Sequence, residues 1–141
     1  MSAHSTIALE YADGTVEAVY CHWDGYLSHN GRILRDSYSD PFKLQQLIDL
    51  GNLSVLAEEV TPTGAHVFEN AQKGVCLFYG RDRGETEQDK ERFTDYADYL
   101  SNADFCGFDY ILRKDGNWYV NSGDIFGFVE LGEAFKKAGN L

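Results

Sequence analysis

Two apolar segments around an Asp-Gly pair constrain the fold of this chain more than any other feature. Residues 6–11 and 16–21 are rich in strand-forming side chains, and they flank Asp13-Gly14. Because Asp-Gly is a preferred sequence for a type I′ turn, this region predicts a β-hairpin. A turn at Asp13-Gly14 would place one apolar face of the hairpin on the core, through the pairs Tyr11–Val16, Leu9–Ala18 and Ile7–Tyr20.

The rest of the chain predicts a second hairpin, a buried strand and several helices. Asp115-Gly116 predicts a hairpin between residues 110–113 and 117–120. The apolar run 75–79 predicts a strand buried on both faces at the centre of the sheet. Helices are expected over residues 27–38, 41–50, 89–101 and 129–138. Residues 52–73 are compatible with short strands or a loop. We therefore predict an α+β fold, with a mostly antiparallel sheet of about five to six strands covered by three to four helices.

Length and composition predict one domain over residues 1–141. The chain has 141 residues, of which 43% are hydrophobic, enough for a single core. It contains no apolar stretch of the roughly 18 to 20 residues that a membrane span needs, and its N-terminus lacks the pattern of a signal peptide. The three cysteines are irregularly spaced, which predicts neither a disulfide framework nor a zinc site. We expect a cytoplasmic protein, in the host cytosol, with no bound metal and no cofactor.

The charge of the chain is strongly negative and unevenly distributed. There are 23 acidic and 12 basic residues, giving a formal charge of −11. A polyanionic partner would be repelled, so we expect no direct binding to nucleic acid or to an anionic membrane, and a basic partner instead. Residues 85–109, called the acidic segment below, hold eight acidic and two basic residues.

Within the acidic segment, the predicted helix 89–101 places Glu91, Asp95 and Asp98 on one face, at i, i+4 and i+7. Their spacing is about 5 to 6 Å, close to the spacing of phosphates along a DNA strand. Together with Glu87 they are the predicted partner-binding residues. The alternative is a solvated helix face that keeps the protein soluble.

Two motifs carry the remaining candidate residues. His22-Trp-Asp-Gly-Tyr26 ends a strand, and Phe78-Tyr-Gly-Arg-Asp-Arg-Gly-Glu85 opens a glycine-bracketed loop. With the sequence Gly31-Arg-Ile-Leu34, these motifs resemble a family of small uncharacterised phage and prophage proteins, although Leu27 stands where such proteins often have proline. The resemblance covers most of the chain. It implies a phage or prophage origin and assigns no role to any residue.

The two motifs suggest a ligand site as an alternative. Arg81 and Arg83, with Arg32, could form a cationic pocket for phosphate or carboxylate. The side chains of His22, Trp23, Asp24 and Tyr26 would lie beside a bound base. The opposing interpretation is a structural network in which Asp82, Glu85 and Asp24 pair with the arginines.

Catalysis has little support in the sequence. Cys21 and His22 are neighbours on a strand and point to opposite faces, and His22 with Asp24 supplies at most two metal ligands. We therefore predict no catalytic residue. The leading hypothesis is a non-enzymatic phage or prophage accessory protein, an anti-CRISPR or anti-restriction inhibitor that binds a host nucleic-acid-handling protein through its acidic surface. The alternative is a nucleotide- or anion-binding protein that sequesters a defence signal.

Overall fold

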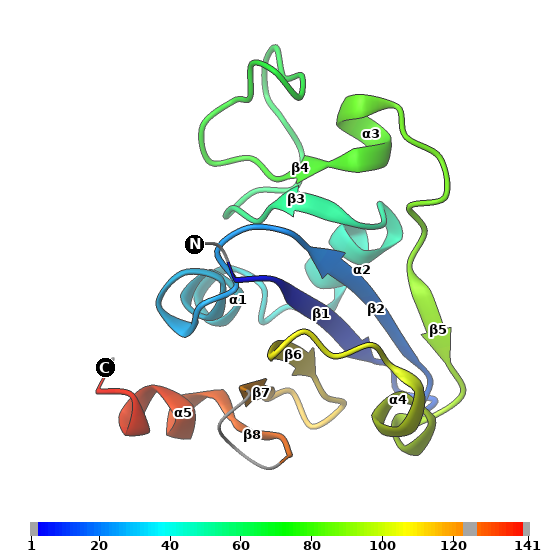
Figure 1. Ribbon diagram of the computed structural model, residues 1–141, viewed down its shortest axis with the longest axis vertical. Helices are drawn as coiled ribbons and strands as arrows, with labels where there is room; N and C mark the ends of the chain where they lie inside the picture. Colours follow the sequence, from blue (N-terminus) through cyan, green and yellow to red (C-terminus); the bar gives the residue numbers. More distant parts are fainter. Residues whose placement is uncertain (1–2, 123–126, 140–141) are drawn as a thin grey trace.

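A mixed β-sheet forms the centre of the computed structural model, which describes residues 3–122 and 127–139 (Figure 1). Over these residues the sheet has eight strands in the order β4-β3-β2-β1-β6-β7-β8, with β5 also paired to β2. The strands are β1 (Ser5–Glu10), β2 (Val16–Cys21), β3 (Leu53–Val55), β4 (Leu77–Phe78), β5 (Glu91–Phe93), β6 (Phe108–Leu112), β7 (Trp118–Ser122) and β8 (Val129–Glu130). The β1–β6 and β2–β3 pairs are parallel.

The prediction of an α+β fold is confirmed, but the predicted sheet was too small and too uniform. The sheet is mixed because β6 returns to β1 after a long excursion and joins it in parallel. Four of its strands, β3, β4, β5 and β8, are only two or three residues long. Such short strands carry too few alternating residues to be found by periodicity.

Helices cover both faces of the sheet. They are the π-helical turn η1 (Leu27–Gly31), α1 (Arg32–Ser37), α2 (Pro41–Asp49), α3 (Tyr79–Arg83), α4 (Tyr96–Asn102) and α5 (Leu131–Lys137). Apolar residues of α1, α2 and α5 pack with Ile7 and Leu9 in the larger core cluster. Tyr99 of α4 packs with Ala8 and Ala18 in a smaller cluster on the opposite face. Both faces of β1 and β2 are therefore buried.

The best-predicted helix is α2. The Asp40 side chain accepts a hydrogen bond from the Phe42 amide at 2.9 Å, and Pro41 is the first helical residue. Leu44, Leu47 and Ile48 form one apolar face of the helix and are buried, and Gly51 follows the helix with φ +85°. The predicted helix over residues 41–50 is therefore confirmed, with α2 ending at Asp49.

The first hairpin forms as predicted, but its register differs by one residue. The structure pairs Leu9 with Glu17, Ala8 with Ala18 and Ile7 with Val19. The loop is longer than a two-residue turn, because the Tyr11 amide donates to the Thr15 carbonyl oxygen at 2.8 Å. A one-residue shift moves the side chains of one strand to the other face. Val16 and Ala18 consequently lie on the α4 face, opposite Ile7 and Leu9.

Two further expectations are corrected. The apolar run 75–79 contributes β4 at an edge of the sheet, whereas β1 and β2 occupy its centre. The predicted helix 89–101 is divided: Glu91–Phe93 forms β5 on the edge of β2, and α4 begins only at Tyr96. The helix starts there because the Asp95 side chain caps it, accepting from the Asp98 amide at 2.8 Å.

Candidate functional site

The HWDGY motif begins where β2 ends, and its first side chains join an aromatic cluster. Nδ1 of His22 lies 2.9 Å from the Tyr20 hydroxyl. Its ring centroid lies 4.6 Å from that of His4 and 4.9 Å from that of Trp23. His22 is half-buried at the rim of the sheet, whereas Trp23 and Tyr26 are 45% and 38% exposed. The cluster could stack against a planar group, but its imidazole already has neighbours within the protein.

The Asp-Gly turn of this motif is held by buried polar groups. Asp24 has φ +59°, and a Cβ at Gly25 would collide with the backbone of the N-terminal segment. The buried Asn30 amide donates to the Trp23 carbonyl oxygen at 3.2 Å, and the Tyr110 hydroxyl donates to the Gly25 carbonyl oxygen at 2.6 Å. These contacts explain the glycine and the aspartate of the motif as parts of a fixed turn.

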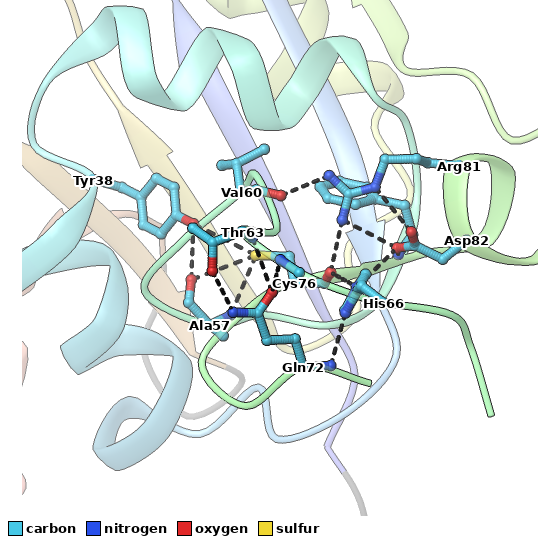
Figure 2. Close-up of polar contacts among 11 residues, drawn as sticks. Tyr38, Ala57, Val60, Thr63, His66, Gln72, Cys76, Arg81 and Asp82 are labelled. Atoms are coloured by element: carbon cyan, nitrogen blue, oxygen red, sulfur yellow. Dashed lines mark hydrogen bonds and ion pairs between the residues drawn. The ribbon is translucent and has the colours of Figure 1, made fainter. Parts of the chain in front are cut away.

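Residues 79–83 of the second motif form α3, where Arg81 is bound by groups of the protein itself (Figure 2). Its guanidinium donates to the carbonyl oxygens of Val60 at 2.6 Å and Cys76 at 3.0 Å, and to the Asp82 carboxylate at 2.9 Å. Burial alone would raise the pKa of Asp82, yet the hydrogen bond from Arg81 holds it below its ordinary value. Nε2 of His66 lies 3.5 Å from the same carboxylate. The network fastens the loop before β4 to α3.

The other two predicted anion-binding arginines also have internal neighbours. Nε of Arg83 lies 2.6 Å from the Glu85 carboxylate, and its guanidinium carbon lies 4.7 Å from the ring centroid of Phe68. The guanidinium carbon of Arg32 lies 5.6 Å from the ring centroid of Phe135. α3 lies beside β4 at the edge of the sheet, whereas α1 lies nearer its centre (Figure 1). The arginines are thus held in different parts of the fold.

The four predicted partner-binding acids do not form a helical stripe. Glu87 lies in the loop before β5 with φ +61°, and Glu91 lies on β5. Asp95 and Asp98 hold the start of α4, because each accepts a backbone hydrogen bond there. The bond from the Thr94 amide lowers the pKa of Asp98. Glu87 and Glu91 are exposed and do not hold the start of α4, so they are the two of the four that are best placed to meet a partner.

The two basic side chains of the acidic segment pair with acids outside it. Because residues alternate along β5, Arg92 points away from the face that carries Glu91. Nη2 of Arg92 lies 2.7 Å from Glu17, and Nζ of Lys90 lies 3.1 Å from Glu17 and 2.6 Å from Asp49. Within the described part of the chain, seven of the eight carboxylates of the segment form no ion pair. One is the buried Asp109, and the other six are Glu87, Asp89, Glu91, Asp95, Asp98 and Asp104.

A cleft of about 340 Å³ opens within the acidic segment, on the α4 face of the sheet. The outer edge of β2 pairs with β5 at residues 16–18 and with β3 at Cys21, which leaves a gap between the two pairings. The cleft lies at this gap, where the Tyr20 amide donates to the Asn52 side chain at 2.9 Å. Its rim carries three exposed carboxylates, and its walls combine apolar and aromatic residues with polar ones: Asp89, Glu91 and Asp104, then Ala18, Phe93 and Tyr99, then Thr6 and Asn52.

Buried polar groups lie beside the cleft, in contact with the lining residues Thr6 and Cys106. Asp109 accepts hydrogen bonds from the Thr6 hydroxyl at 2.7 Å and the Cys106 amide at 3.0 Å, and its burial raises its pKa. The Tyr99 hydroxyl lies near the Thr6 hydroxyl, which already donates to Asp109. Tyr99 is fully buried, and its hydroxyl makes no hydrogen bond within residues 3–122 and 127–139. Such a group calls for a physical explanation.

The sequence did not single out the residues that form this cleft. Asp89 and Asp104 belong to the acidic segment, but neither they nor Tyr99 is among the predicted site residues. Their neighbours come from β1, β2 and the start of β3. Only the assembled sheet brings these segments together, so local spacing held no signal for the cleft.

Comparisons of the chain with protein-family models, curated proteins and solved structures found no match. The likeness to phage and prophage proteins therefore stays a prediction. No helix over the described residues has the length and apolar character needed to cross a membrane. Over the same residues, no group of three or more His, Cys, Asp or Glu side chains is arranged to hold a metal ion.

Proposed function

We propose that this chain is a non-catalytic binding protein that docks through its acidic segment onto a basic surface of another protein. The observation that carries the proposal is that most acidic side chains of that segment are unpaired, whereas both of its basic side chains are paired. Apart from the buried Asp109, six carboxylates of the segment form no ion pair within the described residues, while Lys90 and Arg92 are bound by Glu17 and Asp49. A surface of this kind attracts basic proteins and speeds their encounter.

The class of partner follows from the charge and from the resemblance to phage and prophage proteins. Proteins that bind nucleic acids present basic surfaces to the phosphate backbone. An acidic protein that occupies such a surface competes with the nucleic acid. We therefore propose that the partner is a host nucleic-acid-handling protein of a CRISPR or restriction system, and that the chain acts as its inhibitor.

The anion-binding alternative has weaker support in the geometry. An anion site needs guanidinium groups with donors directed at the ligand. Arg81 donates to two carbonyl oxygens and to Asp82, and Arg83 pairs with Glu85. Binding phosphate with these side chains would first break contacts that hold α3 and the loop before β4.

The test uses cells that carry a CRISPR or restriction system and express the protein during phage infection. We expect the wild-type chain to raise the efficiency of plating. The double variant Glu87→Lys with Glu91→Lys should lose this effect, because it reverses two charges of the surface that meets the partner. Both side chains are exposed and neither caps a helix, so the fold should be kept. Glu58→Lys with Glu69→Lys is the matched control, since it makes the same charge change at exposed positions outside the acidic segment.

The control variant should protect the phage as well as the wild-type chain does. Thermal denaturation of both purified variants shows whether the fold is kept. The proposal is overturned if the wild-type chain leaves the efficiency of plating unchanged in every CRISPR- or restriction-carrying strain tested. It is also overturned if the folded double variant protects as fully as the wild type.

A further inference from the structure

We propose that the cleft beside α4 is a pocket for one arginine side chain of the partner. This inference rests on the proposed function and names the contact that would give it specificity. The cleft volume of about 340 Å³ lies at the lower end of the range for ligand pockets. It offers room for a single long side chain, projecting from the basic surface that the acidic segment faces.

The rim of the cleft supplies the charge complementarity. Asp89, Glu91 and Asp104 line it, all three are exposed, and none forms an ion pair within the described part of the chain. Glu91 reaches the cleft because side chains alternate between the two faces of β5. Arg92 lies on the opposite face, where it pairs with Glu17. A cation that enters the cleft therefore meets three carboxylates that are not already paired with a basic side chain of the described residues.

The walls suit the aliphatic stem and planar head of arginine. Ala18, Phe93 and Ala103 offer apolar contact for the methylene groups, which long basic side chains commonly bury. Tyr20, which is half-buried, contributes an aromatic ring, on which a guanidinium stacks favourably. A lysine ammonium is more strongly hydrated and presents a point charge, so it exploits these walls less well.

The buried Tyr99 hydroxyl is a second, independent observation that favours a ligand at the cleft. Tyr99 lines the cleft and is fully buried, yet its hydroxyl makes no hydrogen bond within residues 3–122 and 127–139. The neighbouring Thr6 hydroxyl is already committed to Asp109. A buried hydroxyl without a partner is costly, and a guanidinium N–H is a suitable donor to its oxygen.

The same geometry argues against a bare metal ion as the occupant. No group of three or more His, Cys, Asp or Glu side chains in the described residues is arranged to hold a metal. The carboxylates surround a space that is larger than one ion needs and that has apolar walls. An extended organic cation fits such a space better, because its methylenes and its charge are separated along one axis.

The test is a titration of the isotope-labelled full chain with N-acetylarginine amide, followed by NMR. We expect shifts of the backbone amide signals of Ala18, Phe93 and Ala103, with a dissociation constant on the order of 1 mM for so small a ligand. N-acetylcitrulline amide has nearly the same shape without the charge. It should leave these signals unchanged, and N-acetyllysine amide should bind more weakly than the arginine derivative.

Two variants test the named contacts. Tyr99→Phe should keep the melting temperature, since the hydroxyl has no bond to lose, and should weaken arginine binding by about five- to tenfold. Glu91→Gln should weaken it as well. Glu87→Gln is the matched control, because it removes one charge of the same acidic segment from a residue that does not line the cleft.

The inference is overturned if citrulline and arginine derivatives shift the same signals equally. It is also overturned if Tyr99→Phe and Glu91→Gln bind arginine as tightly as Glu87→Gln does. If the arginine titrations overturn the inference but Tyr99→Phe still protects the phage, the proposed function is retained and only the arginine pocket is rejected. Arginine binding in the cleft without protection against any defence system would overturn the proposed function alone.

Discussion

The Glu10 carboxylate at the end of β1 accepts two hydrogen bonds from the Arg113 guanidinium, which follows β6. Nε of Arg113 lies at 3.0 Å and Nη2 at 3.2 Å, and the Lys114 amide donates to the same carboxylate at 3.1 Å. The Glu10 side chain is only 3% exposed. The guanidinium carbon also lies 3.6 Å from the ring centroid of Tyr96. One ion pair thus connects the central strands to α4.

Removing the charge of Glu10 should destabilise the fold. In Glu10→Gln the side chain keeps its shape but leaves the Arg113 guanidinium with a neutral partner. We expect a loss of about 1–3 kcal/mol in the free energy of unfolding, measured by urea denaturation. Asp36→Asn is the control, because the Arg35–Asp36 pair is exposed and should contribute less than about 1 kcal/mol. Equal losses in the two variants would contradict this role for the pair.

The same carboxylate predicts a loss of stability in acid. Burial would raise the pKa of Glu10, but the hydrogen bonds from Arg113 and the Lys114 amide leave it below its ordinary value of 4.5. The stabilising interaction is therefore present above the ordinary pKa and is lost as pH falls through the lowered one. Asp109, whose pKa is raised by burial, acts in the opposite direction, because its protonation in acid relieves a buried charge.

The measurement is the melting temperature between pH 7 and pH 3. We expect a plateau above about pH 5 and a decline below about pH 4.5 for the wild-type chain. The decline should be smaller in Glu10→Gln, which has no carboxyl to protonate at this position. A variant whose melting temperature falls as steeply as that of the wild type would show that Glu10 does not govern the acid limb.

The sequence predicted those elements that are specified by local signals. Asp40, Pro41 and Gly51 mark the ends of α2 directly, and the second Asp-Gly hairpin forms between β6 and β7. The register of the first hairpin was wrong because both faces of β1 and β2 are buried. Where both faces are apolar, hydrophobic alternation cannot distinguish one register from its neighbour.

The acidic segment shows where local periodicity fails. Phe93 and the apolar residues that follow it fit a helical stripe, but pairing with β2 holds Glu91–Phe93 as a strand. Residues 91–93 form a strand because they pair with the edge of β2, which is distant in sequence. The cleft has the same origin, because it exists only where the pairings of β3 and β5 leave part of that edge open.

Arg81 should stabilise the loop before β4 rather than bind a ligand. Arg81→Ala removes the hydrogen bonds to Val60, Cys76 and Asp82. We expect a loss of about 1–3 kcal/mol in unfolding free energy and faster limited proteolysis within residues 60–75. Arg83→Ala is the control, because its side chain is about half exposed and its ion pair is correspondingly weaker. A nucleotide that raised the melting temperature of the wild type but not of Arg81→Ala would favour the anion-binding alternative instead.

Cys106 should be the only one of the three thiols to react in the native protein, because Cys21 and Cys76 are buried. Burial, with the nearby carboxylates of Asp109 and Asp104, raises the pKa of the Cys106 thiol. Its thiolate is therefore scarce at neutral pH, and the rate of alkylation by iodoacetamide should rise about tenfold per pH unit below that pKa.

Asp104→Asn removes one of these carboxylates and should lower the pKa of the Cys106 thiol, which increases the alkylation rate at pH 8. Glu133→Gln, an exposed residue on α5, is the control and should leave the rate unchanged. Mass spectrometry of the alkylated peptides identifies the reacting cysteine. Because Asp104 and Cys106 both line the cleft, the alkylation rate reports the negative potential there. An alkylation rate that is the same in Asp104→Asn and in the wild type would show that this carboxylate does not affect the potential inside the cleft.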